Sequence, residues 1–261
     1  MAVCAGSSET ERSSGSRQAR VPAAIVKLLL ALLGTALFGL YLTINALSAG
    51  RPARSLETPL DRAIPFRPAW TYVYVAAFVF PFLPLALVRH LGVFKRTVAA
   101  FAAVLLFCCA CYLVFPVRIE RPTFPIESLA TWGLGLTYTI DHPYNCFPSF
   151  HLGSAFLTAL VAWRLDRAIG AGAFLLATLI GVSTLFTKQH FAADVAAGIL
   201  VAYAAFRAIV ARHVPDLPRL ALTYGRPVTL VIPAAYTVAV AISFLLYRAG
   251  SLPFSWPPPP H

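Results

Sequence analysis

Two histidines and one aspartate are the residues of this sequence best suited to chemistry. His190 and Asp194 are four residues apart, so on a helix they lie on one face, one turn apart. A carboxylate beside an imidazole can hold one ring N–H, fix the tautomer and leave the other nitrogen as a nucleophile or base. His151 follows Pro148 and Ser149, which mark the start of an expected helix. These residue types predict nucleophilic or acid–base chemistry.

Nearby amides and cations predict an anion site at the same place. The free N–H groups in the first turn of the helix that starts at Ser149, together with its dipole, attract an anion. Arg121 and Lys188 could supply the positive charge that a phosphoryl group needs. Phosphoryl transfer requires mainly positioning and charge neutralisation. The set therefore fits that reaction.

Plainer interpretations of these residues stay open. A histidine at the end of a span is more often interfacial than catalytic, and Arg121 and Lys188 alone would be snorkelling or topology-setting residues. His190, Asp194 and His151 could also be three ligands of an open zinc or iron site. Membrane desaturases and hydroxylases use many more histidines than the six present here, so we expect no metal.

Long uncharged stretches predict the elements that position these residues. The chain is 59% hydrophobic and 12% charged, whereas a soluble domain carries roughly 25% charged residues. Charge-free stretches of roughly 20 residues recur, which is the length a helix needs to cross a bilayer. The sequence thus predicts an all-α, polytopic transmembrane helical bundle. The predicted spans are residues 23–46, 69–89, 97–116, 149–165, 168–187, 190–211 and 227–247.

One transmembrane catalytic domain, residues 21–250, is expected between two tails. Residues 1–20 have the composition of a disordered tail, and residues 251–261 are rich in proline. Two long polar connections, residues 50–68 and 117–148, are where we expect chemistry.

The predicted topology brings the candidate residues to one face of the membrane. The ends of the first, third and fifth spans share a face, and segments 118–122, 146–151 and 183–194 all fall on it. Lys and Arg are more frequent on the opposite face, so the N-terminus is expected in the cytoplasm and the site on the extracytoplasmic side of the plasma (inner) membrane. We assign the net charge of +11 to this asymmetry and expect no nucleic-acid partner.

At these residues the chain resembles the type 2 phosphatidic acid phosphatase superfamily, which includes lipid phosphate phosphatases and vanadium haloperoxidases. The family has a basic stretch ending in Arg-Pro, then Pro-Ser-Gly-His, then Ser-Arg followed by His and Asp. Arg121-Pro122, residues 148–151 and residues 183–194 are similar to these motifs, and the similarity covers roughly residues 55 to 212. The resemblance implies a six-helix phosphatase-type core plus one additional C-terminal span.

The resemblance also implies a role for each site residue. His190 would attack phosphorus to form a phosphohistidine, Asp194 would orient His190, and His151 would protonate the leaving group. Arg121 and the amides around Ser149 would hold the phosphate. No metal or other cofactor is implied.

Departures from the motifs are similar to one branch of the superfamily. The upstream Lys of the first motif falls at Val114, so Arg118 could replace it. The Gly of the second motif is Phe150, the Arg of the third falls at Thr184, and Lys188 could replace that Arg. A bulky residue before the motif His is typical of the inositolphosphorylceramide synthase-like (inositolphosphotransferase) branch and its bacterial relatives.

Residues 60–66 are similar to that branch as well. A hydrolase and a transferase would share the phosphoenzyme and differ in whether water or a lipid hydroxyl accepts the group. We therefore expect a membrane lipid phosphate, either a phospholipid or an isoprenoid phosphate, as the substrate, and leave the acceptor open. The rival interpretation is a non-catalytic transporter or scaffold that binds anionic lipid.

Overall fold

A computed structural model describes residues 23–213 and 231–251 of the chain. These residues form a helical bundle without named strands, which confirms the predicted all-α class. The predicted tail 1–20, and all of the tail 251–261 except Ser251, lie outside the described residues. The helices are α1 (Ala23–Leu47), α2 (Pro59–Ala63), η1 (Pro68–Trp70), α3 (Thr71–Tyr74), α4 (Ala76–Val79), η2 (Phe80–Phe82), α5 (Leu83–Leu87), α6 (Leu91–Val114), α7 (Leu129–Ile140), α8 (Phe150–Leu165), α9 (Arg167–Phe186), α10 (Ala192–Ala205), the π-helical η3 (Phe206–Ala211) and α12 (Val231–Arg248).

Five helical segments of the described ranges are long and apolar enough to cross a membrane, so the chain is a multi-pass membrane protein. The predicted span 149–165 corresponds to the shorter apolar helix α8. The predicted span 227–247 corresponds to α12, and its first residues, 227–230, lie outside the described part. The five segments are Ile25–Leu47, Pro68–Leu87, Leu91–Val114, Arg167–Phe186 and Ala192–Ala211.

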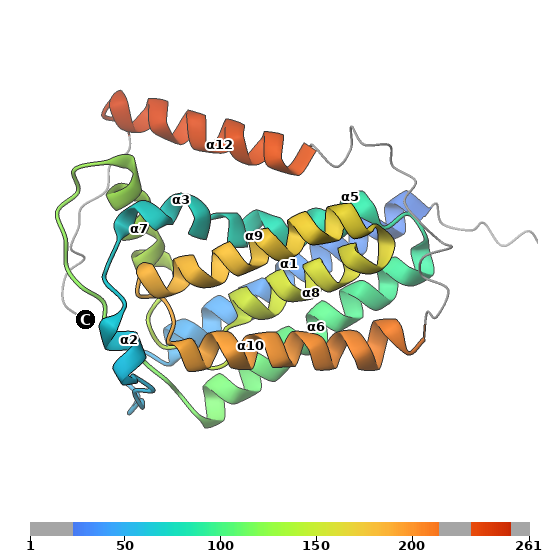
Figure 1. Cartoon of the computed structure of the whole chain (residues 1–261), viewed down its shortest axis with the longest axis horizontal. Helices are drawn as coiled ribbons and strands as arrows, with labels where there is room; N and C mark the ends of the chain where they lie inside the picture. The colour runs from blue at the N-terminus through green and yellow to red at the C-terminus, as the bar shows by residue number, and fades with distance from the viewer. Residues whose placement is uncertain (1–22, 214–230, 252–261) are drawn as a thin grey trace, which may run out of the picture.

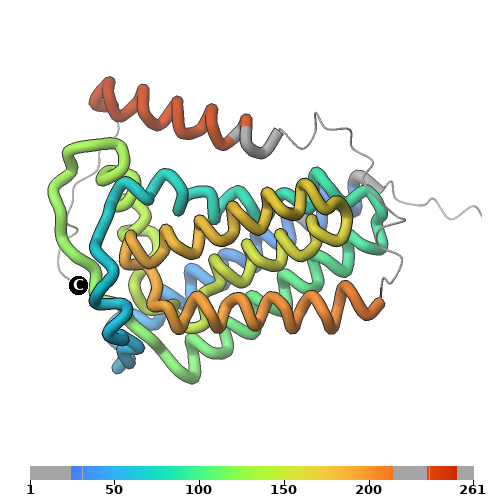
Figure 2. Tube along the Cα trace, viewed as in Figure 1, coloured from blue at the N-terminus to red at the C-terminus, as the bar shows by residue number. Residues whose placement is uncertain are grey.

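The second of these segments is not one regular helix. It consists of the short pieces η1, α3, α4, η2 and α5 (Figure 2). The first pieces, η1 to α4, pack against α9, and the later ones, α4 to α5, pack against α8. Pro81 and Pro84 account for the breaks at η2 and α5, because proline lacks an amide hydrogen and its ring collides with the preceding turn. The next helix, α6, begins at Leu91 rather than at residue 97, because it continues through Lys95 and Arg96. A charge-free stretch marks the apolar part of a helix and not its end.

Two short helices order the connections that were predicted as polar loops. α7 has 12 residues, too few to appear in a search for membrane-length stretches. Ser128 and Thr131 form a capping box at its start, and Thr58 and Asp61 form another at the start of α2. Both helices lie at the same end of the bundle (Figure 1).

The buried centre of the bundle is α8, which packs against α6, α9 and α10. Leu152, Ala155 and Leu157 have no exposed surface. Small residues let the backbones approach closely, as is usual between membrane helices. A Cβ added to Gly198 of α10, for example, would lie 2.4 Å from the carbonyl oxygen of Ser149. The additional helix α12 lies outside this core, against α4 and α7 (Figure 1).

Candidate active site

The three segments that carry the candidate residues converge at one end of the bundle. The starts of α8 and α10 lie there beside the ends of α1, α6 and α9 (Figure 1). Isolated parallel bridges join Arg54 to Val117 and Val117 to Asn145, so the loops that follow α1, α6 and α7 run side by side. This pairing brings the segment that contains Arg121 next to the loop that leads into α8.

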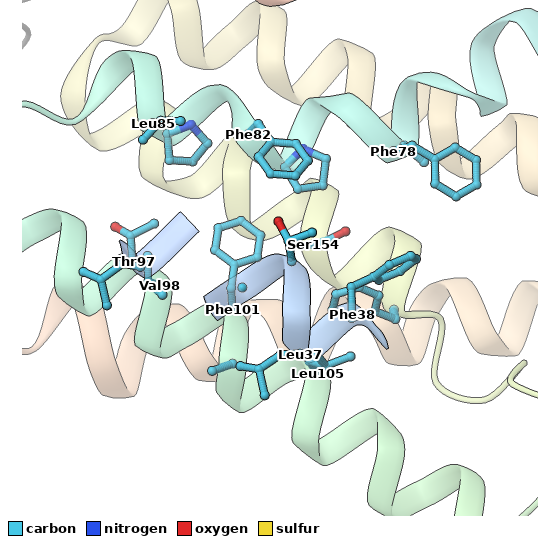
Figure 3. Close-up of a pocket in the computed structure, with 18 of the residues that line it drawn as sticks. Leu37, Phe38, Phe78, Phe82, Leu85, Thr97, Val98, Phe101, Leu105 and Ser154 are labelled. Atoms are coloured by element: carbon cyan, nitrogen blue, oxygen red, sulfur yellow. The ribbon is translucent and has the colours of Figure 1, made fainter. Parts of the chain in front are cut away.

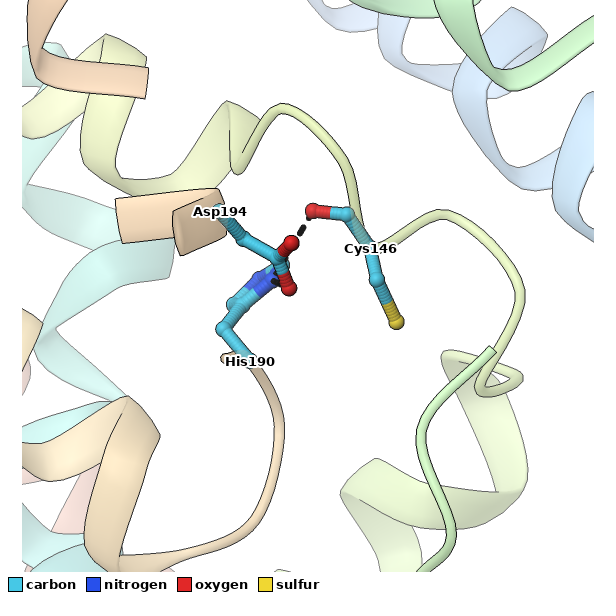
Figure 4. Close-up of side chains that lie close together, drawn as sticks. All are labelled: Cys146, His190 and Asp194. Carbon is cyan, nitrogen blue, oxygen red and sulfur yellow. Dashed lines mark hydrogen bonds and ion pairs between the residues drawn. The ribbon is translucent and has the colours of Figure 1, made fainter. Parts of the chain in front are cut away.

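His190 is buried directly before α10 and is oriented through its Nδ1 atom. This atom lies 3.1 Å from the carbonyl oxygen of Cys146 and 3.5 Å from Oδ2 of Asp194 (Figure 4). The same Asp194 oxygen accepts a hydrogen bond of 2.8 Å from the amide of Phe191, which fixes the carboxylate. Both neighbours of Nδ1 are acceptors, so Nδ1 carries the hydrogen and the lone pair is on Nε2.

His151 lies in the first turn of α8, and its ring faces that lone pair. Its Nδ1 is 3.3 Å from Nε2 of His190. Because Nε2 of His190 has no hydrogen in this tautomer, the hydrogen between the two rings belongs to His151. On the other side of the ring, Nε2 lies 3.3 Å from the hydroxyl of Tyr74 and 3.8 Å from Oδ2 of Asp141. The two imidazoles are therefore arranged as a nucleophile or base beside a proton donor.

A polar cavity of about 640 Å³ opens beside His190. Four side chains contribute positive charge to its wall and three contribute negative charge: Arg54, Arg118, Arg121 and Lys188 against Glu57, Asp61 and Glu120. Arg118 also lies over the ring of Tyr144, with 5.7 Å between its Cζ and the ring centre. Three of the predicted binding residues thus line one cavity with the predicted nucleophile.

Arg121 is the most rigidly held of these cations. Its Nη1 donates to the carbonyl oxygens of Asp141 at 2.6 Å and of Tyr138 at 3.3 Å, and its Nη2 donates to the side chain of Gln189. The guanidinium also lies over the Tyr138 ring, 4.3 Å from its centre. Its buried Nε has no hydrogen-bond partner among the described residues. These contacts pre-orient the guanidinium at the cavity wall, where its charge can attract an anion.

Lys188 and Asp61 join α2 to the turn that carries His190. Lys188 adopts a left-handed backbone (φ 50°), and its Nζ donates to the carbonyl oxygens of Asp61 at 2.9 Å and of Ile64 at 2.6 Å. The Asp61 carboxylate accepts a bond of 2.7 Å from the amide of Ala192, at the start of α10. Burial opposes the charge, but hydrogen bonds from Thr58 and Ala192 lower the pKa of Asp61 below its ordinary value. Lys188 thus lines the cavity while its ammonium holds α2.

The structure places Ser149 and Phe150 away from the polar cavity. The Ser149 hydroxyl caps α8 by accepting from the amide of Leu152 at 3.3 Å. Its own amide donates to the carbonyl oxygen of Asp194 at 3.0 Å, which ties α8 to α10. The Phe150 ring packs against Tyr41, with 5.9 Å between the centres. The binding role expected of both residues stays a prediction: Ser149 here joins α8 to α10, and Phe150 also lines a separate apolar cavity.

A second cavity, of about 280 Å³, is almost entirely apolar (Figure 3). Phe38, Phe82 and Phe101 are among the side chains that line it, and they come from α1, η2 and α6. His151 and Ser154 of α8 contribute polar atoms to its wall. His151 therefore borders the apolar cavity, and its partner His190 borders the polar one.

The same region contains a possible metal-ligand group that differs from the set considered in the sequence analysis, where no metal was expected. Ligand atoms of Cys146, His190 and Asp194 lie within 4.8 Å of one another (Figure 4). Burial, and next the negative charge of Asp194, raises the pKa of the Cys146 thiol, which disfavours the thiolate that a metal requires. The position of Nδ1 of His190 beside two oxygen acceptors fits an N–H better than a metal bond.

Three residues at the site were not identified from the sequence. Gln189 holds Arg121, and Tyr74 and Asp141 face His151. Tyr74 lies in an apolar span and Asp141 at the end of α7, so no spacing connects them to His151. Gln189 could have been suspected, because it directly precedes His190.

Comparison with known proteins identifies a family but no individual relative. No curated protein and no solved structure matches the chain. The PAP2 superfamily profile, however, matches residues 52–208, which contain all the candidate site residues. That match supports phosphatase-type chemistry on a lipid phosphate. The chain belongs to the PAP2 superfamily.

Proposed function

We propose that this protein is an integral membrane lipid phosphatase or phosphotransferase that works through a phosphohistidine at His190. The observation that carries the proposal is the position of Nε2 of His190. It has a lone pair set by Asp194, lies at the wall of a cavity with four basic side chains, and faces the N–H of His151 at 3.3 Å.

The two cavities suit the two parts of a lipid phosphate. The polar cavity offers the positive charge of Arg118, Arg121 and Lys188 to the phosphate. The apolar cavity lies among the spans and offers aromatic and aliphatic side chains to a lipid chain. His151 stands where the ester oxygen between phosphate and chain would lie. A phospholipid or an isoprenoid phosphate fits this arrangement.

The reaction would take place in two steps. Nε2 of His190 attacks phosphorus, the bond between phosphorus and the lipid oxygen breaks, and that oxygen takes the proton from Nδ1 of His151. Water or a lipid hydroxyl then attacks the phosphohistidine, gives its proton to His151 and releases His190. Asp194 stabilises the positive His190 ring through Nδ1–H, and Arg121 stabilises the charge on the phosphoryl oxygens.

The choice of acceptor and the orientation in the membrane belong to the same proposal. Phe150 in place of glycine, together with residues 60–66, favours head-group transfer of the inositolphosphotransferase type. The distribution of Lys and Arg favours a cytoplasmic N-terminus and an extracytoplasmic site.

Turnover by purified protein in detergent tests the proposal. We expect phosphate release or label transfer from at least one of phosphatidate, a diphosphorylated isoprenoid, or phosphatidylinositol with ceramide. The variant His190→Ala should lose turnover, and orthovanadate should inhibit the wild type. His90→Ala is the matched control, because His90 precedes α6 and does not border the polar cavity. Binding without turnover across the panel would instead favour the transporter or scaffold.

A further inference from the structure

We infer that Asp141 is a positioning residue that prepares His151 to protonate the leaving group. The inference rests on the proposed function, in which His151 supplies that proton. It adds a second histidine–carboxylate pair to the pair formed by His190 and Asp194. Each imidazole of the site would then have its own acid.

The Asp141 carboxylate is buried and fixed from one side. Its Oδ1 accepts a hydrogen bond of 2.9 Å from the Tyr41 hydroxyl and one of 2.6 Å from Nδ2 of Asn45, both on α1. Its own amide closes α7 by donating to the carbonyl oxygen of Thr137 at 2.9 Å. These contacts turn Oδ2 toward Nε2 of His151, at the ion-pair distance of 3.8 Å.

The surroundings of His151 explain why it needs a carboxylate. The rings of Tyr41, Tyr74 and Phe78 lie within 6.2 Å of the imidazole, centre to centre. Such a buried aromatic setting disfavours a charged imidazole. A carboxylate within about 4–6 Å favours the charged form. Asp141 is positioned to counter the burial.

The geometry also determines which proton is delivered. In the charged ring, Nε2–H faces the Tyr74 hydroxyl and Asp141, and Nδ1–H faces the side of His190 where phosphorus would bind. Transfer of the Nδ1 proton to the lipid oxygen leaves a neutral ring whose remaining hydrogen still faces Asp141. The carboxylate acts as an orienting group and not as the proton source.

Asp141 also connects α1 to the site, so a loss of activity in a variant would not by itself show this role. Two phosphate esters that differ by one methylene group separate the possibilities. 4-Nitrobenzyl phosphate releases an alkoxide-type leaving group that needs a proton, whereas 4-nitrophenyl phosphate releases a stable phenolate. With Asp141→Asn, we expect kcat/KM for the benzyl ester to fall about 10²-fold and for the phenyl ester to fall less than about threefold, because only the first requires acid catalysis.

A double-mutant comparison supplies the second criterion. If Asp141 acts only through His151, adding Asp141→Asn to His151→Asn should slow the benzyl ester no further. Asp166→Asn is the matched control, because Asp166 caps α9 and asparagine caps equally well. Equal losses on both esters, or additive losses in the double variant, would overturn the inference about Asp141 alone. Turnover that survives His190→Ala would overturn the proposed function as well.

Discussion

Replacing Gly198 with alanine should disturb the contact that holds the two histidine segments together. Gly198 lies one turn after Asp194 on α10 and faces the start of α8. The new Cβ would lie 2.4 Å from the carbonyl oxygen of Ser149 and 3.3 Å from the amide nitrogen of Gly153. Both neighbours are backbone atoms, so no side chain can rotate to make room.

The size of the effect follows from these distances. An ordinary contact begins near 3.4 Å, so α10 and α8 must separate by about 1 Å. Overpacking of this kind costs about 1–3 kcal/mol of unfolding free energy. A misplacement of about 1 Å among reacting groups costs about 10²-fold in rate. We expect kcat to fall by about that factor, because Asp194 moves with α10 while His151 moves with α8.

The assay is steady-state phosphate release together with thermal unfolding, both in detergent. Gly172→Ala on α9 is the matched control, since its Cβ would enter open space, and alanine in a helix should stabilise by about 0.4–1 kcal/mol. A Gly198→Ala variant with wild-type kcat and stability would refute the reasoning that this contact sets the geometry of the site.

Three further predictions concern individual side chains. Arg121→Ala should lower kcat/KM for a lipid phosphate by about 10²–10³-fold, because a pre-oriented guanidinium is lost. Arg118→Ala should lower kcat/KM clearly less, and steady-state kinetics of the two variants measures the difference. Asp194→Asn should lower kcat by about 10²–10⁴-fold with a small change in KM, since the tautomer of the nucleophile is no longer fixed. Folding lowers the pKa of Asp61, so its carboxylate stabilises the folded protein at pH values above the ordinary pKa of 3.8. This stabilisation is lost as the pH falls through the lower pKa of the folded state. Asp61→Asn should therefore be less stable than the wild type at neutral pH, and the difference in melting temperature should shrink in acid.

Spacing along the chain was enough to select the candidate catalytic residues, because each was part of a local pattern. His190 and Asp194 are one helical turn apart, and His151 follows a helix start. Their convergence followed from counting spans, since an odd number of crossings brings the ends of α1, α6 and α9 to one face.

Contacts between distant segments could not be read in the same way. Tyr74 and Asp141 reach His151 from other elements, and no period in the sequence relates them. Ser149 has the residue type of a phosphate-binding cap, yet its amide is used by the carbonyl oxygen of Asp194. Helix α7 was missed for a different reason, since it is shorter than a membrane span.

Trapping of the phosphoenzyme tests the central claim most directly. Wild-type protein is mixed with a ³²P-labelled lipid phosphate, quenched in alkali within the first turnover and digested for mass spectrometry. The account predicts phosphate on Nε2 of His190, and no label in His190→Ala. Turnover without a phosphorylated His190, or label on another residue, would contradict it.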